Sequence, residues 1–74
     1  MKSTNQLICN YIIENWLGDS SNRAFAIAHN IDEKTVRQIR AINKIDYSIT
    51  IKSLEAICTA ENLSLHEFFE KIGK

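Results

Sequence analysis

Proline is absent from the 74-residue sequence and glycine occurs only twice, so few of the residues that interrupt helices are present. Neither sign of charge is in excess. Nine basic and nine acidic side chains balance, which argues against the basic surplus common in nucleic-acid-binding proteins. With 45% apolar and 24% charged residues, the composition is that of an ordered globular chain. We expect a single all-α domain over residues 1–74, too small for most enzyme folds.

Cysteine and long apolar runs are scarce as well. Cys9 and Cys58 lie far apart in helical patterns without a CxxC pair, which predicts reduced thiols in the core. His29 and His66 match no familiar zinc-finger spacing with these cysteines, so we expect no metal site, no cofactor, and histidines that pack at the surface or the core edge. No apolar stretch approaches the length of about 18 residues that predicts a membrane span. Together with the polar start, MKSTNQ, this favours a cytoplasmic protein without an export signal.

Apolar residues recur at steps of three and four along five segments, a spacing that places them on one face of a helix. Asn30 and Asn62 follow the second and fourth segments, and asparagine is the best residue after glycine for a left-handed helix end. Ser64 and Glu67 have the S-x-x-E spacing of a capping box, which opens the fifth segment. The expected helices cover residues 4–17, 22–29, 33–42, 51–61 and 65–72, and the fourth is expected to turn Ile51, Leu54, Ile57 and Cys58 inward.

A short turn separates the second and third helices, which is the layout of a helix-turn-helix over residues of about 22–41. Ala26 is small enough to lie where the two helices cross, and Ile31 can fill the space beneath the turn. Val36 and Ile39 then hold the third helix against the second. Each of these features alone is weak, but the combination at these offsets is fairly specific.

At these residues the chain resembles the Xre family of helix-turn-helix regulators, the group of the phage Cro protein and phage repressors. The resemblance lies in SNRAFAIAHNIDEKTVRQI and in TIKSLEAICTAENLSLHEFF, and it implies a five-helix lambda-repressor-like DNA-binding domain. The chain departs from the family pattern at several positions. Asn30 and Asn62 replace glycine, and Arg40 stands where an acidic residue is common. His29 and Glu61 replace apolar residues, so Glu61 must reach solvent or pair with a base.

The resemblance implies that the third helix lies in the major groove, with residues near its N-terminal end at the base edges. Arginine or lysine can donate to guanine, glutamine can pair with adenine, and glutamate can accept from cytosine. As an alternative, Glu33 and Arg37 form only a surface ion pair, since they lie four residues apart. Carried over by position, the base-contacting residues are Glu33, Lys34, Arg37 and Gln38.

Phosphate contacts are expected on both flanks of the third helix. The start of the second helix offers backbone amides and a positive helix end, which favour anions. Residues 20–44 carry five basic and two acidic side chains, so the neutral chain is locally positive here. The alternative for each candidate is an ordinary solvated side chain. The phosphate-contacting candidates are Ser21, Asn22 and Arg23 on one flank and Arg40, Asn43 and Lys44 on the other.

The fifth expected helix carries more large apolar residues than so small a core needs. Members of this family are commonly two-fold dimers on palindromic half-sites, so we expect part of this helix to form a dimer interface. The alternative is that Phe68 and Phe69 both fill the core of the monomer, as we expect for Tyr11 and Trp16. The residues of the expected dimer interface are Leu65, Phe68, Phe69 and Ile72.

The sequence thus predicts a sequence-specific double-stranded DNA-binding transcriptional regulator, a repressor or autoregulator, that binds a palindromic operator as a homodimer. Among the roles known for such small members, the resemblance allows a phage repressor, a restriction-modification controller, or an antitoxin with a cognate toxin. The alternative is a helical protein-interaction module that does not bind DNA and makes contact through Phe68 and Phe69. We expect no enzymatic activity, because no catalytic triad, glycine-rich phosphate loop or close carboxylate pair stands out.

Overall fold

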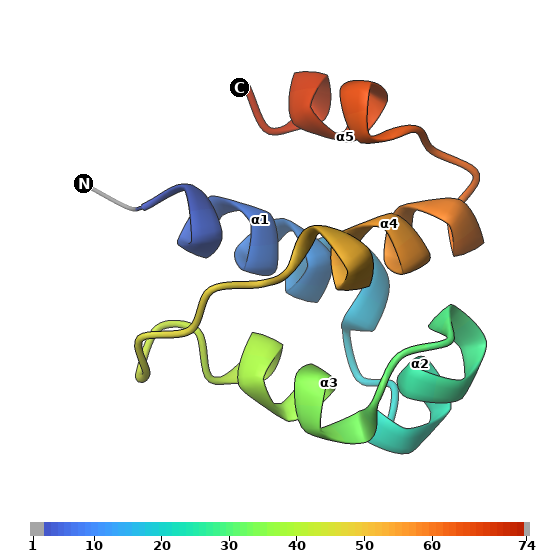
Figure 1. The fold of residues 1–74 in the computed structure, drawn as a ribbon. Helices are drawn as coiled ribbons and strands as arrows, with labels where there is room; N and C mark the ends of the chain where they lie inside the picture. The colour runs from blue at the N-terminus through green and yellow to red at the C-terminus, as the bar shows by residue number, and fades with distance from the viewer. Residues whose placement is uncertain (1–2, 74) are drawn as a thin grey trace.

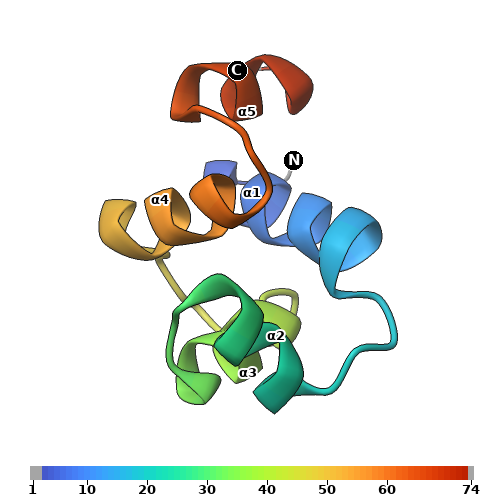
Figure 2. The same ribbon diagram turned by 90° about the vertical axis from the view of Figure 1, so that its right-hand side faces the viewer.

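The computed structural model describes residues 3–73, which form five α-helices, one π-helical segment and no strand. In Figures 1 and 2, α1 and α4 form the middle of the molecule, α2 and α3 lie on one side of them, and α5 lies on the opposite side. The expectation of an all-α chain of five helices is confirmed for these residues. The elements are α1 (Thr4–Ile12), η1 (Ile13–Leu17), α2 (Asn22–His29), α3 (Glu33–Arg40), α4 (Ile51–Ala60) and α5 (Leu65–Lys71).

Side-chain caps define where the helices begin. The hydroxyls of Ser21, Thr50 and Ser64 each accept a hydrogen bond from a backbone N–H in the first turn of the helix that follows. The Ser64 N–H also donates to the Glu67 carboxylate at 3.1 Å, which completes the expected capping box. This backbone hydrogen bond lowers the pKa of the Glu67 carboxyl group. Asp32 occupies the N-cap position of α3 without a side-chain hydrogen bond to its amides.

Two asparagines end helices in the left-handed conformation, as the sequence predicts. Asn30 has φ of 55° and Asn62 has φ of 61°. After each asparagine, the next N–H donates back to a carbonyl oxygen of the preceding helix: Ile31 to Ala26 at 3.0 Å, and Leu63 to Cys58 at 2.8 Å. The two turns therefore satisfy carbonyl groups that the helix ends would otherwise leave without partners.

The first helix does not keep one geometry over its whole length. Its last turn, η1, is a π-helix in which the Gly18 N–H donates to the Ile13 carbonyl at 2.9 Å. Gly18 itself has φ of 47°, a conformation that favours glycine. This wide turn ends with Leu17 buried in the core. The sequence predicts the extent of the helix correctly but not the π-helical turn, because widening one turn leaves the apolar spacing almost unchanged.

The core is built from apolar side chains of all five α-helices. Cys9 and Cys58 are buried free thiols, as expected, and burial raises the pKa of the Cys9 thiol to about 11. The prediction that Ile51 turns inward is wrong, since 58% of its surface is exposed. Ile51 is the first residue of α4, and the residues of this helix that reach the core lie further along it, beginning with Leu54.

Phe68 lies at the centre of an aromatic cluster, and the expectation that it belongs to a dimer interface is wrong. Its side chain is 0% exposed, and its ring centroid lies 5.4 Å from that of Tyr11 and 5.7 Å from that of Trp16. Phe69 packs edge-on against Phe68 but remains partly exposed. The core alternative therefore holds for Phe68, because α5 needs a large side chain to fill the space over α1. The partly exposed apolar residues of this region are Leu65, Phe69 and Ile72.

Removal of the Phe68 ring should destabilise the protein more than removal of its neighbour. We expect Phe68→Ala to lower the free energy of unfolding by about 3–5 kcal/mol, because it leaves a cavity in the aromatic cluster. The matched variant Phe69→Ala should cost clearly less, since part of that ring already contacts water. Urea denaturation followed by circular dichroism measures both losses, and equal losses would contradict the assignment of Phe68 to the core.

Candidate nucleic-acid interface

A short connection, residues 30–32, joins α2 to α3, and the two helices pack directly against each other. We call residues 22–40 the α2–α3 unit. Ala26, Val36 and Ile39 of this unit are buried, as the sequence predicts. Val36 and Ile39 are the two apolar residues of α3, and its other side chains are polar and exposed or partly exposed.

The four candidate base-contacting residues do not share one environment. Glu33, Lys34 and Arg37 are exposed on the outer face of α3, whereas Gln38 is partly buried. A nitrogen of the Arg37 guanidinium lies 3.6 Å from a carboxylate oxygen of Glu33, so the surface ion pair considered from the sequence is present. Both side chains are about half exposed, and an exposed pair of this kind is worth only about 0.3–0.5 kcal/mol. Arg37 can therefore exchange Glu33 for another acceptor at little cost.

A basic hollow lies beside this face. Asn22, Arg37, Arg40, Ala41 and Lys44 line it, and no carboxylate is among its lining residues. Three cationic side chains from α3 and the turn after it therefore meet the N-terminal end of α2, which carries the positive end of the helix dipole. We call this surface the basic hollow, and its charge favours an anion.

Arg40 connects the end of α3 to the segment before α2. Its Nε donates to Asn22 Oδ1 at 2.6 Å, Nη1 donates to the Gly18 carbonyl at 3.1 Å, and Nη2 donates to the Ser20 carbonyl. These contacts use at least three of the five N–H groups of a guanidinium. They give the arginine at this position a structural role. The phosphate contact predicted for Arg40 remains a prediction, with its remaining N–H groups as the donors.

The other candidate phosphate-contacting residues divide into two groups. The side chains of Asn43 and Asn10 exchange two hydrogen bonds, at 3.0 and 3.3 Å, which hold the turn after α3 against α1. The Ser21 hydroxyl caps α2, and the Asn22 side-chain oxygen accepts from Arg40. Arg23 and Lys44, by contrast, are exposed and take part in no ion pair within residues 3–73. They are the two phosphate candidates with uncommitted charges.

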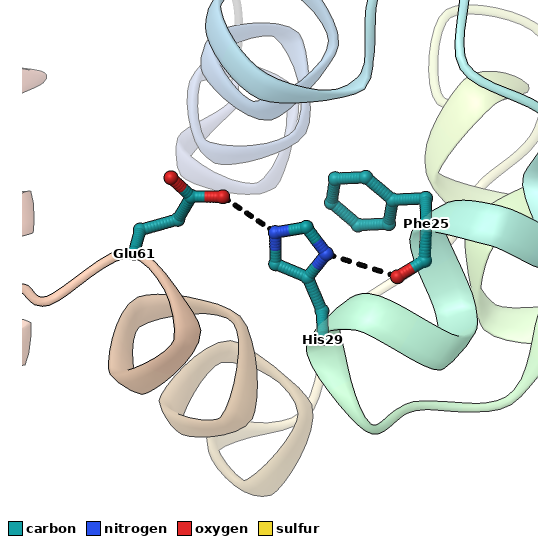
Figure 3. A network of polar contacts seen from close by, with 3 residues as sticks. All are labelled: Phe25, His29 and Glu61. Carbon is teal, nitrogen blue, oxygen red and sulfur yellow. Dashed lines mark hydrogen bonds and ion pairs between the residues drawn. The ribbon is translucent and has the colours of Figure 1, made fainter.

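A second polar cluster lies at the opposite end of α2 (Figure 3). His29, the last residue of α2, is only 7% exposed, and its Nε2 lies 2.5 Å from Oε2 of Glu61, the C-cap residue of α4. Its Nδ1 lies 2.9 Å from the carbonyl oxygen of Phe25, whose ring stacks on the imidazole at a centroid distance of 3.8 Å. The sequence indicates that Glu61 needs solvent or a base, and His29 is its partner. No sequence pattern could join the two, since they are 32 residues apart.

Within residues 3–73 no group of three or more histidine, cysteine, aspartate or glutamate side chains is placed to hold a metal ion. No helix in the same part of the chain has both the length and the apolar character needed to cross a membrane. We found no family model, curated protein or solved structure that matches the chain.

Two of the three basic residues of the hollow, Arg40 and Lys44, should differ in their effect on stability. We expect Arg40→Ala to lower the free energy of unfolding by about 1–2 kcal/mol, because three acceptors lose a charged donor. Lys44→Ala should change it by less than about 0.5 kcal/mol, since this lysine has no such contacts. Thermal and urea unfolding measure both effects, and an Arg40→Ala protein as stable as Lys44→Ala would contradict the structural role of Arg40.

Proposed function

We propose that this protein is a sequence-specific double-stranded DNA-binding transcriptional regulator, a repressor or autoregulator, that presents α3 to the major groove. The observation that carries this proposal is the pairing of the outer face of α3 with the basic hollow beside it. One surface then offers side chains that read base edges and, next to them, cations that bind phosphate.

The dimensions of α3 are suitable for this role. An α-helix with its side chains is about 10–12 Å across, and the major groove is about 12 Å wide, so α3 can enter it. Glu33, Lys34 and Arg37 project from the exposed face and can reach base edges without any rearrangement of the core. Arg37 is the best candidate for a base contact, because its planar guanidinium can donate two hydrogen bonds to guanine once it leaves Glu33. Gln38 is the weakest of the four candidates, because its side chain is partly covered.

The basic hollow and Arg23, the residue after Asn22, supply the contacts to the DNA backbone in this proposal. Lys44 and Arg23 bind phosphate oxygens directly, since neither has an ionic partner within the described residues. Arg40 acts chiefly as a positioning residue, because it fastens Asn22 and the segment before α2 to the end of α3. With a net charge of zero for the whole chain, nonspecific binding should be weak, and affinity should depend on specific contacts and on a dimer.

We further propose that two copies bind a palindromic operator through a homodimer interface on α5. Leu65, Phe69 and Ile72 are partly exposed there, whereas Phe68 is excluded because it is buried. Since α5 lies on the side opposite α2 and α3, the two-fold axis must run from the α5 layer towards the α3 layer (Figure 2). Only then do both copies of α3 face the same duplex. This requirement restricts the contact to an edge of α5.

Binding to duplex DNA tests the proposal directly. We expect the logarithm of the binding constant to fall with the logarithm of salt concentration, with a slope of about −0.9 per phosphate neutralised. Arg37→Ala should relax base preference and cost about 1–3 kcal/mol on the preferred site, while Lys44→Ala should weaken all sequences alike and make the slope shallower by about one unit. Selection from a random duplex pool followed by fluorescence anisotropy measures these effects.

Lys71→Ala is the matched control for these variants, because this exposed lysine belongs to α5, which lies on the opposite side of the molecule from α3 (Figure 1). It should leave both affinity and salt slope unchanged. A flat salt response of the unmodified protein, or no binding, would contradict the proposal and favour the helical protein-interaction module. Equal losses on selected and random DNA for Arg37→Ala would remove its base-reading role alone.

The dimer is tested by sedimentation equilibrium with and without the selected duplex. We expect the unmodified protein to bind as a dimer and Phe69→Ser to bind as a monomer with lower affinity, because a polar residue replaces an apolar contact. His66→Ser is the control, since this exposed neighbour on α5 lies outside the proposed contact. A protein that stays monomeric on the selected duplex would show that the α5 interface is wrong.

A further inference from the structure

The contacts of His29 need one more proton than a neutral imidazole carries. Both nitrogens of the imidazole face oxygen atoms, the Phe25 carbonyl at Nδ1 and the Glu61 carboxylate at Nε2. A carbonyl oxygen can only accept, so Nδ1 must carry a proton for its contact of 2.9 Å. A neutral imidazole then has only a lone pair at Nε2 to turn towards the carboxylate. The contact of 2.5 Å therefore needs a further proton between Nε2 and Oε2.

The surroundings favour that proton on the histidine. The charged and titratable groups near the ring come from α4: Glu61 touches it, and Glu55 lines the same surface hollow as His29. Cys58 lies one turn before Glu61, and the pKa of its thiol is raised first by burial and then by the charge of Glu61. The charged side chains of α3, the other helix packed against α2, are exposed. The Glu61 carboxylate in contact with the ring and the aromatic face stacked on it both stabilise an imidazolium, and they oppose the burial of the ring, which disfavours the charged form.

We propose that the His29–Glu61 contact is a proton-dependent clasp that holds the α2–α3 unit on α4. With both ring nitrogens protonated, the imidazolium donates to α2 and to the end of α4 at once and so joins them. When the second proton leaves, the carboxylate faces a lone pair in a poorly hydrated contact, and that repulsion loosens the junction. The helices then depend on apolar packing alone at this end of α2.

The clasp has a consequence for DNA binding that rests on the proposed function. Because α2 and α3 pack directly against each other, a loosened junction at His29 should change how firmly α3 is held relative to the rest of the molecule. Protonation should therefore favour the arrangement that binds duplex DNA. In this role His29 and Glu61 are positioning residues, since neither lines the basic hollow.

Unfolding at different pH values tests the clasp without any DNA. Histidine changes charge between about pH 5 and pH 8, and one proton bound only by the folded state changes the unfolding equilibrium by up to about tenfold per pH unit. Because the folded state holds this proton, the unfolding constant of the unmodified protein should rise as the pH rises. His29→Gln and Glu61→Gln should both flatten this rise. His66→Gln is the matched control and should retain it, since His66 is exposed and has only a surface contact with Glu70 at 3.5 Å.

Nitrogen-15 spectra of the histidine rings in the unmodified protein keep the test decisive if a variant fails to fold. We expect both nitrogens of the His29 ring to be protonated and hydrogen-bonded at about pH 6. A His29 ring with only one protonated nitrogen in the folded protein at that pH would overturn the proposal. So would a His29→Gln protein with the same pH profile as the unmodified chain.

Affinity for duplex DNA, measured at about pH 6 and at about pH 8, tests whether the clasp affects DNA binding, because histidine loses its charge between about pH 5 and pH 8. The unmodified protein should bind more tightly at the lower pH, and Glu61→Gln should remove most of this difference. If no duplex binds at either pH, the proposed function fails, while the unfolding profiles still decide the clasp. If DNA binds and its affinity is independent of pH, the clasp does not act on the interface.

Discussion

The burial of Val36 and Ile39 in the core, where α3 packs against α2 and α1, is the constraint on which the rest of the structure depends. These are the two apolar residues of α3, and both are fully buried. With Val36 and Ile39 buried, the polar side chains of α3 are left exposed or only partly covered. The polar face that we propose reads DNA is thus a direct consequence of a small apolar contact, since a helix this short is not stable without tertiary packing.

Polar contacts then hold α2 at both of its ends. At the start, Arg40 reaches from α3 to Asn22 and to carbonyl groups of the preceding segment. At the end, Glu61 reaches from α4 to His29. Apolar packing is tolerant of small rotations, whereas hydrogen bonds with fixed geometry are not. The two contacts therefore fix the orientation of α2 at both of its ends.

Charge is distributed in the fold in a way that the neutral total conceals. The surplus of basic residues between positions 20 and 44 lies along α3, the turn after it and the start of α2. Some of these residues form hydrogen bonds or ion pairs within the molecule. Arg40 and Arg37 both have internal partners, while Lys44 and Arg23 have no ionic ones among the described residues. The same set of basic residues thus serves two purposes, since some position the surface and others remain available to a ligand.

The sequence by itself determined the local features: the caps at Ser21, Thr50 and Ser64, the left-handed Asn30 and Asn62, and the apolar stripe of α3. These depend on residues within a few positions of one another, where backbone geometry is the same in any fold. Only the tertiary structure decided that Phe68 fills the core, that Arg40 binds the segment before α2, and that Glu61 meets His29. Those contacts join residues from different helices, and their partners depend on packing angles that no local spacing encodes.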